Sequence, residues 1–205
     1  MKRVGKNMET ELGQKKHLFT NKQLWALLVP VVVEQILNSL MGTADTMMVS
    51  NVGSAAISAV SLVDSINVLV IQVFAALAAG GTIICSQYMG QKNVKNATDA
   101  AKQLIFIITA IAVVLTAVCV VFQIPLLHLI FGKVEEEVMT NSEVYFLYTA
   151  LSFPFIAVFN AGSSVFRAQE NTSLPMTISV ISNIMNIVGN AILIFGFHMG
   201  VAGAA

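Results

Sequence analysis

Charged residues are scarce in this sequence: Asp, Glu, Lys and Arg together make up 11% of its 205 residues. A soluble domain usually carries about a quarter charged residues, so this chain has too few to cover a globule in water. The formal net charge is zero, which argues against a nucleic-acid partner held through phosphate contacts. Hydrophobic residues reach 56%, as expected for a chain surrounded by lipid.

Cysteine and histidine are also rare, and they lack the spacing of a reactive site. Cys85 and Cys119 lie inside apolar runs with no second sulfur or histidine at ligand spacing, so we interpret them as packing residues. His17 lies in a polar leader, and His128 and His198 lie near predicted helix ends. Neither a His-Glu-x-x-His nor a Gly-x-Ser-x-Gly motif occurs. We therefore expect no enzyme.

Long apolar runs dominate the remainder of the chain. A spanning helix needs about 20 mostly apolar residues. The predicted spans are residues 24–49, 59–88, 104–126, 144–166 and 175–197, with a sixth that starts near residue 200 and is cut off. The first run is too long for a cleavable signal peptide, so it should remain as an anchor. The sequence thus predicts an all-α integral membrane protein, with a basic leader over residues 1–22 and a transmembrane lobe over residues 23–205.

The positive charges predict the orientation of these spans. Six Lys or Arg residues lie in the leader and three between the second and third spans, and Arg167 begins the loop after the fourth. The opposite side has only Lys133, beside Glu135–Glu137, a run we interpret as a solvated loop. Because positive charge collects on the cytoplasmic side, we expect a cytoplasmic N-terminus and a multi-pass protein of the bacterial inner membrane.

Three acidic residues fall inside the predicted spans: Glu34, Asp45 and Asp64. An ionisable residue in a membrane helix is costly, so its default interpretation is functional. At 100° per residue, Glu34, Asn38 and Asp45 lie on one stripe of the first span. Pro30, on the same side, removes a backbone hydrogen bond and invites a bend. These features suit a helix that lines a cavity.

Amide and hydroxyl side chains form further stripes. Asp64 and Asn67 share one side of the second span, and the fifth span carries a polar row at Ser179, Asn183, Asn186 and Asn190. Such groups can be interhelical hydrogen bonds worth ~0.6 kcal/mol each, and we favour that interpretation for most of them. For Asp45 we favour function, because a carboxylate contributes poorly to packing. Glu34 and Asp64 stay open between the two.

A carboxylate removed from water can hold a proton, or it can coordinate a small cation together with amide oxygens. A cationic substrate would compete for the same negative charge. Binding of one ligand would then release the other, which is the physical basis of antiport.

The order and spacing of several segments resemble the first half of bacterial multidrug and toxic compound extrusion (MATE) transporters. These segments are Pro30–Gln35, Ala44–Ser50, Ala79–Thr82, Ser86–Gly90, Phe166–Glu170, Leu174–Met176, Asn183, Asn186–Ile187 and Gly200–Ala205. The resemblance implies a six-helix lobe, paired with a C-terminal lobe of the same polypeptide. It further implies export of cationic or amphipathic small molecules in exchange for Na⁺ or H⁺, without a cofactor.

The resemblance also implies roles for individual residues. Asp45 matches the first-helix aspartate of cation coupling and becomes a possible Na⁺ ligand, and Asn186 assists the same site. Gln35 matches a polar position near the substrate cavity, where we also place Glu34, Asn38, Asp64, Asn67 and Asn183. Many relatives have an aspartate where this chain has Asn190. A sodium site of Asp45 and neutral oxygens, or a site that also uses Glu34 or Asp64, is therefore as plausible as a two-carboxylate proton site.

The main alternative is a flippase for a lipid-linked precursor, from the same wider superfamily. A flippase for an anionic carrier should have several basic residues in its cavity. Because no Lys or Arg lies well within a predicted span, we favour the exporter.

Overall fold

The computed structural model describes residues 21–197 and 199–204, and within them the chain forms helices and no strands. The elements are α2 (Asn21–Ser50), α3 (Ser54–Gly90), α4 (Val94–Val121), α5 (Gln123–Phe131), α6 (Glu136–Ala168), α7 (Ser173–Ala191), the π-helical η1 (Ile192–Gly196) and α8 (Val201–Ala204). Five helices, with α7 and η1 counted together, are long and apolar enough to cross a membrane. The predicted all-α membrane fold is confirmed. Residues 1–20 of the leader, with His17, and also His198 lie outside the described residues.

The helices extend beyond the apolar runs that predict them. The third predicted span starts at residue 104, whereas α4 begins at Val94, and α6 begins at Glu136 rather than at residue 144. Polar helix ends can continue into the aqueous interface, so hydropathy marks only the lipid-exposed part of a helix. The predicted third span also differs at its other end: α4 ends at Val121, and α5 starts as a new helix after Phe122. Pro125 fits the first turn of α5, where a backbone N–H has no helical partner.

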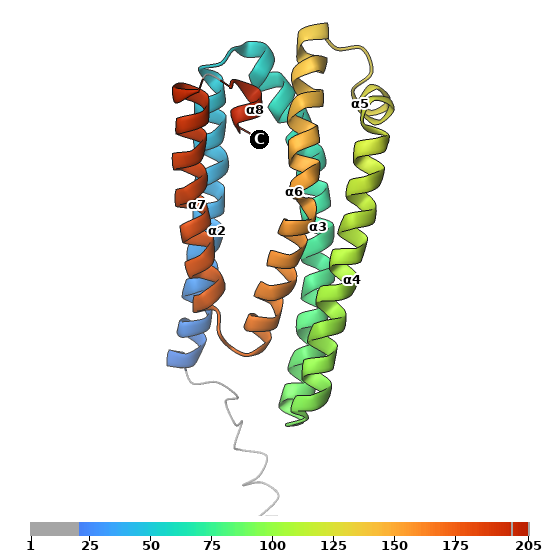
Figure 1. Cartoon of the computed structure of the whole chain (residues 1–205). Coiled ribbons are helices and arrows are strands. Elements are labelled where there is room, and N and C mark those ends of the chain that lie inside the picture. Colours follow the sequence, from blue (N-terminus) through green and yellow to red (C-terminus); the bar gives the residue numbers. More distant parts are fainter. Residues whose placement is uncertain (1–20, 198, 205) are drawn as a thin grey trace, which may run out of the picture.

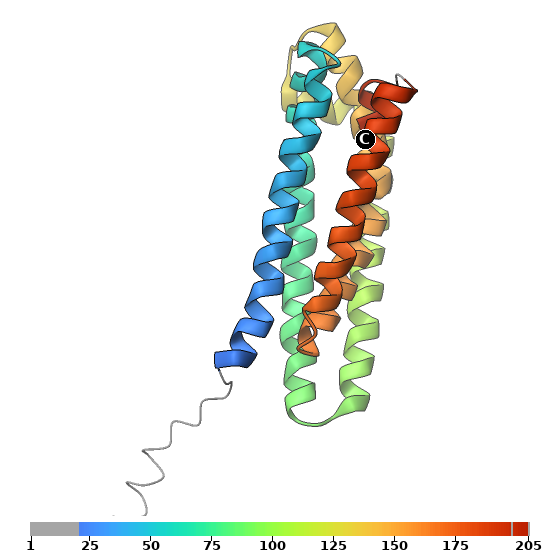
Figure 2. The ribbon, with the colours of Figure 1, turned by 90° about the vertical axis from the view of Figure 1, so that its left-hand side faces the viewer.

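The long helices run along a common direction and form two groups (Figures 1 and 2). In one group, α3 packs along α6, and α4 packs against both. In the other group, α2 pairs with α7. The start of α2, the turn at residues 91–93 and the loop at residues 169–172 lie at the same end of the molecule (Figure 1). We call this the inner end, because it carries the basic loops of the predicted cytoplasmic side.

The group of α3, α4 and α6 contains a tightly packed apolar core. Phe74 and Phe153 meet edge to face with their ring centroids 6.4 Å apart, and Ile108, which is 1% exposed, belongs to the same buried cluster. Small residues bring the helices close: a Cβ atom added to Gly81 would overlap the side chain of Leu104. In membranes such close approach replaces the hydrophobic driving force that holds soluble bundles together. This group therefore forms a closely packed unit beside the α2–α7 pair.

Candidate functional site

Three predicted coupling residues meet where α2 faces α7, near the outer ends of both helices. Asn190 Nδ2 donates a hydrogen bond of 2.9 Å to Asp45 Oδ1. The same nitrogen lies 2.9 Å from Asn186 Oδ1, one helical turn earlier on α7. Asn190 is buried, whereas Asp45 and Asn186 are half-buried. We call Asp45, Asn186 and Asn190 the Asp45 cluster.

A second set of polar contacts lies further toward the inner end of the same pair of helices. Asn38 Oδ1 accepts a hydrogen bond of 3.1 Å from Ser179 Oγ and one of 3.4 Å from Asn183 Nδ2. Ser179 and Asn183 are buried. These are neutral hydrogen bonds between neighbouring helices, the form expected of interhelical packing contacts. They hold α2 against α7 at mid-depth and so fix the height of Asp45 relative to Asn190.

Asp64 belongs to a different pair of helices. Its Oδ1 accepts a hydrogen bond of 3.3 Å from Asn67 Nδ2 on α3 and one of 3.1 Å from the hydroxyl of Tyr145 on α6. We call Asp64, Asn67 and Tyr145 the Asp64 cluster. Asp45 and Asp64 lie close enough for their negative charges to repel each other. The two clusters lie on different pairs of helices in the outer half of the lobe.

Tyr145 is a residue of this site that the polar stripes of the sequence do not indicate. This side chain is 8% exposed, and its hydroxyl reaches Asp64 across 81 positions of sequence. Acidic and amide stripes lie within single helices, so they cannot show contacts between helices. The available signal was a tyrosine inside an apolar span, because a buried phenol needs a hydrogen-bond partner.

Glu34 is paired with an arginine. Arg167 Nη2 lies 2.9 Å from Glu34 Oε1 and 2.8 Å from Oε2. The side chain of Glu34 is 4% exposed and that of Arg167 is 35% exposed. Arg167 lies in the last turn of α6, so the prediction that it begins a loop is wrong. Arg167 balances the charge of Glu34, so the Glu34 carboxylate is not free to bind a coupling ion in this conformation.

Gln35 lies next to Glu34 in the chain but on an exposed face of α2. The structure thus joins Asp45 with Asn186 and Asn190, Asn38 with Asn183, and Asp64 with Asn67. It places Glu34 in an ion pair with Arg167, one helical turn from Asn38 on the side of the inner end.

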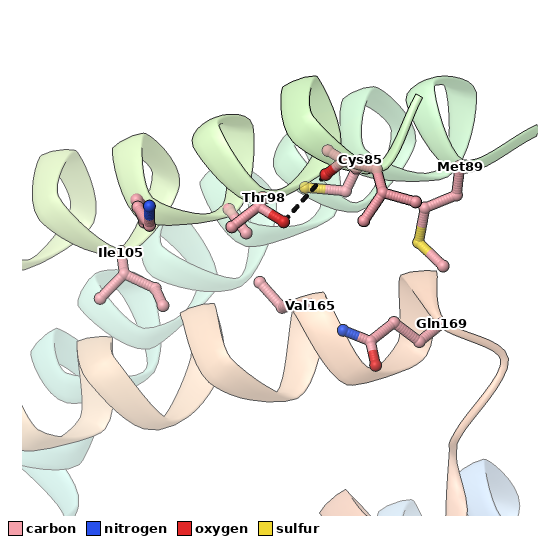
Figure 3. Close-up of a pocket in the computed structure, with 10 residues that line it drawn as sticks. Cys85, Met89, Thr98, Ile105, Val165 and Gln169 are labelled. Atoms are coloured by element: carbon pink, nitrogen blue, oxygen red, sulfur yellow. Dashed lines mark hydrogen bonds between the residues drawn. The ribbon is translucent and has the colours of Figure 1, made fainter. Parts of the chain in front are cut away.

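Two cavities lie near the inner end. One of about 640 Å³ lies where α3, α4 and α6 meet, and Cys85, Thr98 and Val165 lie on its wall (Figure 3). Another of about 860 Å³ lies beside Arg167, between α2 and the inner end of α3. Their walls contain neither Asp45 nor Asp64. Cys85 and Cys119 are 2% and 5% exposed, which agrees with their interpretation as packing residues.

A protein-family model matches most of the chain. The MatE family model matches residues 30–192, a stretch that contains the Asp45 cluster, the Asp64 cluster and the ion pair. The chain belongs to the MatE family.

Two curated relatives match most of this MatE chain. It is 32% identical over 187 residues to the "Uncharacterized transporter YisQ" of Bacillus subtilis (strain 168), covering 89% of this chain and 40% of that protein. It is 30% identical over 191 residues to the "Probable multidrug resistance protein NorM" of Thermotoga maritima, covering 90% of this chain and 40% of that protein. The MatE chain therefore spans about two fifths of the length of these relatives.

Solved structures show the same fold. A MOP superfamily transporter from Pyrococcus furiosus matches with a TM-score of 0.83 at 22% sequence identity, covering 89% of this chain and 40% of that one. A multidrug resistance MATE family transporter, solved in an outward-facing conformation, matches with a TM-score of 0.84 at 22% identity. The resemblance of the sequence to a MATE N-terminal lobe is thereby confirmed for family and fold.

Proposed function

We propose that this MatE chain is the ion-coupling lobe of a secondary antiporter. The antiporter exports organic cations and amphipathic compounds in exchange for Na⁺ or H⁺. One observation carries the proposal: Asp45 is a carboxylate on a membrane-length helix whose hydrogen bond comes from the neutral amide of Asn190. A structural carboxylate would be expected to pair with a basic residue, as Glu34 does with Arg167. Asp45 instead keeps a net charge for a mobile cation.

The mechanism follows from competition for that charge. With its ion bound, Asp45 is neutral and repels no anion and attracts no cationic drug. When the ion leaves, the negative charge returns to a site partly shielded from water, where it attracts a cation strongly. A cationic substrate then binds nearby, and re-entry of the ion on the other side of the membrane displaces it. Asn190 and Asn186 keep the carboxylate oriented in both states.

The proposal includes a second lobe and an orientation. In an antiporter of two lobes related by pseudosymmetry, the substrate passes between the lobes. The second lobe would come from the same polypeptide, or from another copy of this chain. The basic loops at the inner end support a cytoplasmic N-terminus in the inner membrane of a bacterium. The flippase has less support, since Arg167 is already paired and the relatives named above include a multidrug resistance protein.

Dye efflux tests this proposal. Bacteria lacking their own major efflux pumps would express the complete reading frame and be loaded with ethidium, a cationic dye. An anionic fluorescein derivative serves as the matched cargo control. We expect an inward Na⁺ or H⁺ gradient to accelerate ethidium loss several-fold relative to empty-vector cells, with the anionic dye unaffected. Ethidium loss that is independent of both gradients would contradict the antiport mechanism.

A further inference from the structure

The Asp64 cluster contains a buried oxygen without a partner. Asn67 is 8% exposed, and its Oδ1 accepts no hydrogen bond although its Nδ2 donates to Asp64. Buried amide oxygens are almost always satisfied, because leaving one unpaired forfeits its interaction with water. The unpaired oxygen belongs to the same amide group as the nitrogen that donates to Asp64 Oδ1, so it lies within one amide group of the carboxylate. An exception of this kind indicates a missing positive or proton-donating partner.

The donors around Asp64 are already placed on one of its oxygens. Asn67 Nδ2 and the Tyr145 hydroxyl both donate to Asp64 Oδ1. The described structure gives no hydrogen bond to Asp64 Oδ2 from any residue. Two oxygens with available lone pairs, one of them on a carboxylate, therefore remain at this place. Lys and Arg are absent from the described contacts of the cluster, so its negative charge is not neutralised by a side chain.

We propose that Asp64 and Asn67 form a second cation site in this lobe, which holds a small monovalent cation between the Asp64 carboxylate and Asn67 Oδ1. Both Na⁺ and H⁺ have the required chemistry. Oxygen atoms are the ligands that hard metal cations prefer, and Tyr145 Oη can add a third. A proton would bind Asp64 Oδ2 to give the neutral acid, whose O–H then donates to Asn67 Oδ1. Either ion satisfies the unpaired oxygen and cancels the charge of Asp64.

The Asp64 site is separate from the Asp45 cluster but coupled to it. Asp64 is held by α3 and α6, whereas Asp45 is held by α2 and α7. The charges of both carboxylates reach Tyr145, and the two carboxylates repel each other. A cation bound at one site therefore lowers the attraction of the other for its own cation. This inference deepens the proposed function, resting on it for the role of Asp45, whereas the Asp64 site stands on its own contacts.

Ion counting on the purified protein tests the inference. The protein from the complete reading frame would be titrated with ²²Na⁺ at fixed pH, and proton uptake would be followed separately in weakly buffered solution without Na⁺. We expect Asp64→Asn to lower the bound Na⁺, or the protons taken up, by one equivalent per chain. Asn67→Ala should weaken the same binding about tenfold, because it removes the neutral ligand. The count that falls, either that of bound Na⁺ or that of protons taken up, identifies the ion.

Matched controls separate this site from a general effect on folding. Asp99→Asn removes a carboxylate from an exposed ion pair with Lys102, and Tyr148→Phe removes an exposed phenol on α6. Both should leave the ion count unchanged, whereas Tyr145→Phe should weaken binding. Should Asp64→Asn fail to give a monodisperse protein, Asn67→Ala and Tyr145→Phe give the same readout.

Unchanged Na⁺ and proton counts in the folded Asp64→Asn and Asn67→Ala proteins would overturn the second site. The cluster would then be only an interhelical packing contact. Loss of one equivalent in a protein that exports no dye would leave the Asp64 site intact and reject the antiport proposal. Normal ion-coupled export with unchanged counts would reject the Asp64 site alone.

Discussion

Asp45→Asn should reduce gradient-driven ethidium efflux at least tenfold, to the level of cells without the protein. The substitution keeps the size and planar shape of the side chain at the contact with Asn190 and removes only the charge. If the charge attracts both ion and substrate, its loss removes the exchange and leaves each ligand without a site. The measurement is the initial rate of dye loss at equal amounts of protein in the membrane.

The same variant should be at least as stable as the native protein. A carboxylate in a membrane helix is unfavourable unless it is paired, so neutralising it removes a cost. Unfolding in detergent, followed by loss of the monodisperse peak after heating, should therefore show an equal or higher midpoint temperature. Asp99→Asn, on the exposed start of α4, is the control for both measurements. Efflux above half of the native rate in Asp45→Asn would remove Asp45 from the coupling mechanism.

Glu34→Gln should have the largest effect on stability, about 3 kcal/mol of the free energy of unfolding. Breaking a buried ion pair costs about 3–5 kcal/mol, because the remaining charge loses its partner. We expect the lower end of that range, since the side chain of Arg167 is 35% exposed and can reach water. Arg167 Nε is already buried without a partner, so the guanidinium depends on Glu34 for its stabilisation.

The surface pair of Asp99 and Lys102, 3.6 Å apart, provides the comparison. Asp99→Asn should cost less than about 1 kcal/mol, as is usual for exposed pairs. The double exchange Glu34→Arg with Arg167→Glu should recover part of the loss, because it restores opposite charges between α2 and α6. Equal unfolding midpoints for Glu34→Gln and Asp99→Asn would show that the Glu34–Arg167 contact does not hold these helices together.

The apolar runs predicted the membrane fold because lipid imposes a simple length requirement on each helix. The same requirement did not predict the break at Phe122 or the start of α5. Most residues from Phe122 to Phe131 are apolar, so hydropathy alone does not distinguish them from a continuous helix. Periodicity also placed Asp45 and Asn190 on polar stripes of two different helices. Their contact required only that those stripes face each other, and they do.

The pairing of Glu34 could not be predicted in the same way. Arg167 follows an apolar run and reads as the first residue of a basic loop, whereas it forms part of the last helical turn of α6. A long side chain at a helix end can extend along the helix to reach a buried partner. Whether it turns inward to Glu34 or outward to water depends on how the separate helices α2 and α6 are placed relative to each other, which the sequence pattern of one helix does not show. The same limit applies to Tyr145, whose partner lies on another helix.

Ion movement driven by substrate tests the central claim most directly. Purified protein from the complete reading frame would be placed in vesicles containing ²²Na⁺ or a trapped pH indicator, with no ion gradient imposed. Addition of ethidium outside should drive Na⁺ or H⁺ out of the vesicles against the ion's own equilibrium, and Asp45→Asn vesicles should show no such movement. Ethidium entry without any counter-movement of Na⁺ or H⁺ would contradict antiport through the Asp45 cluster.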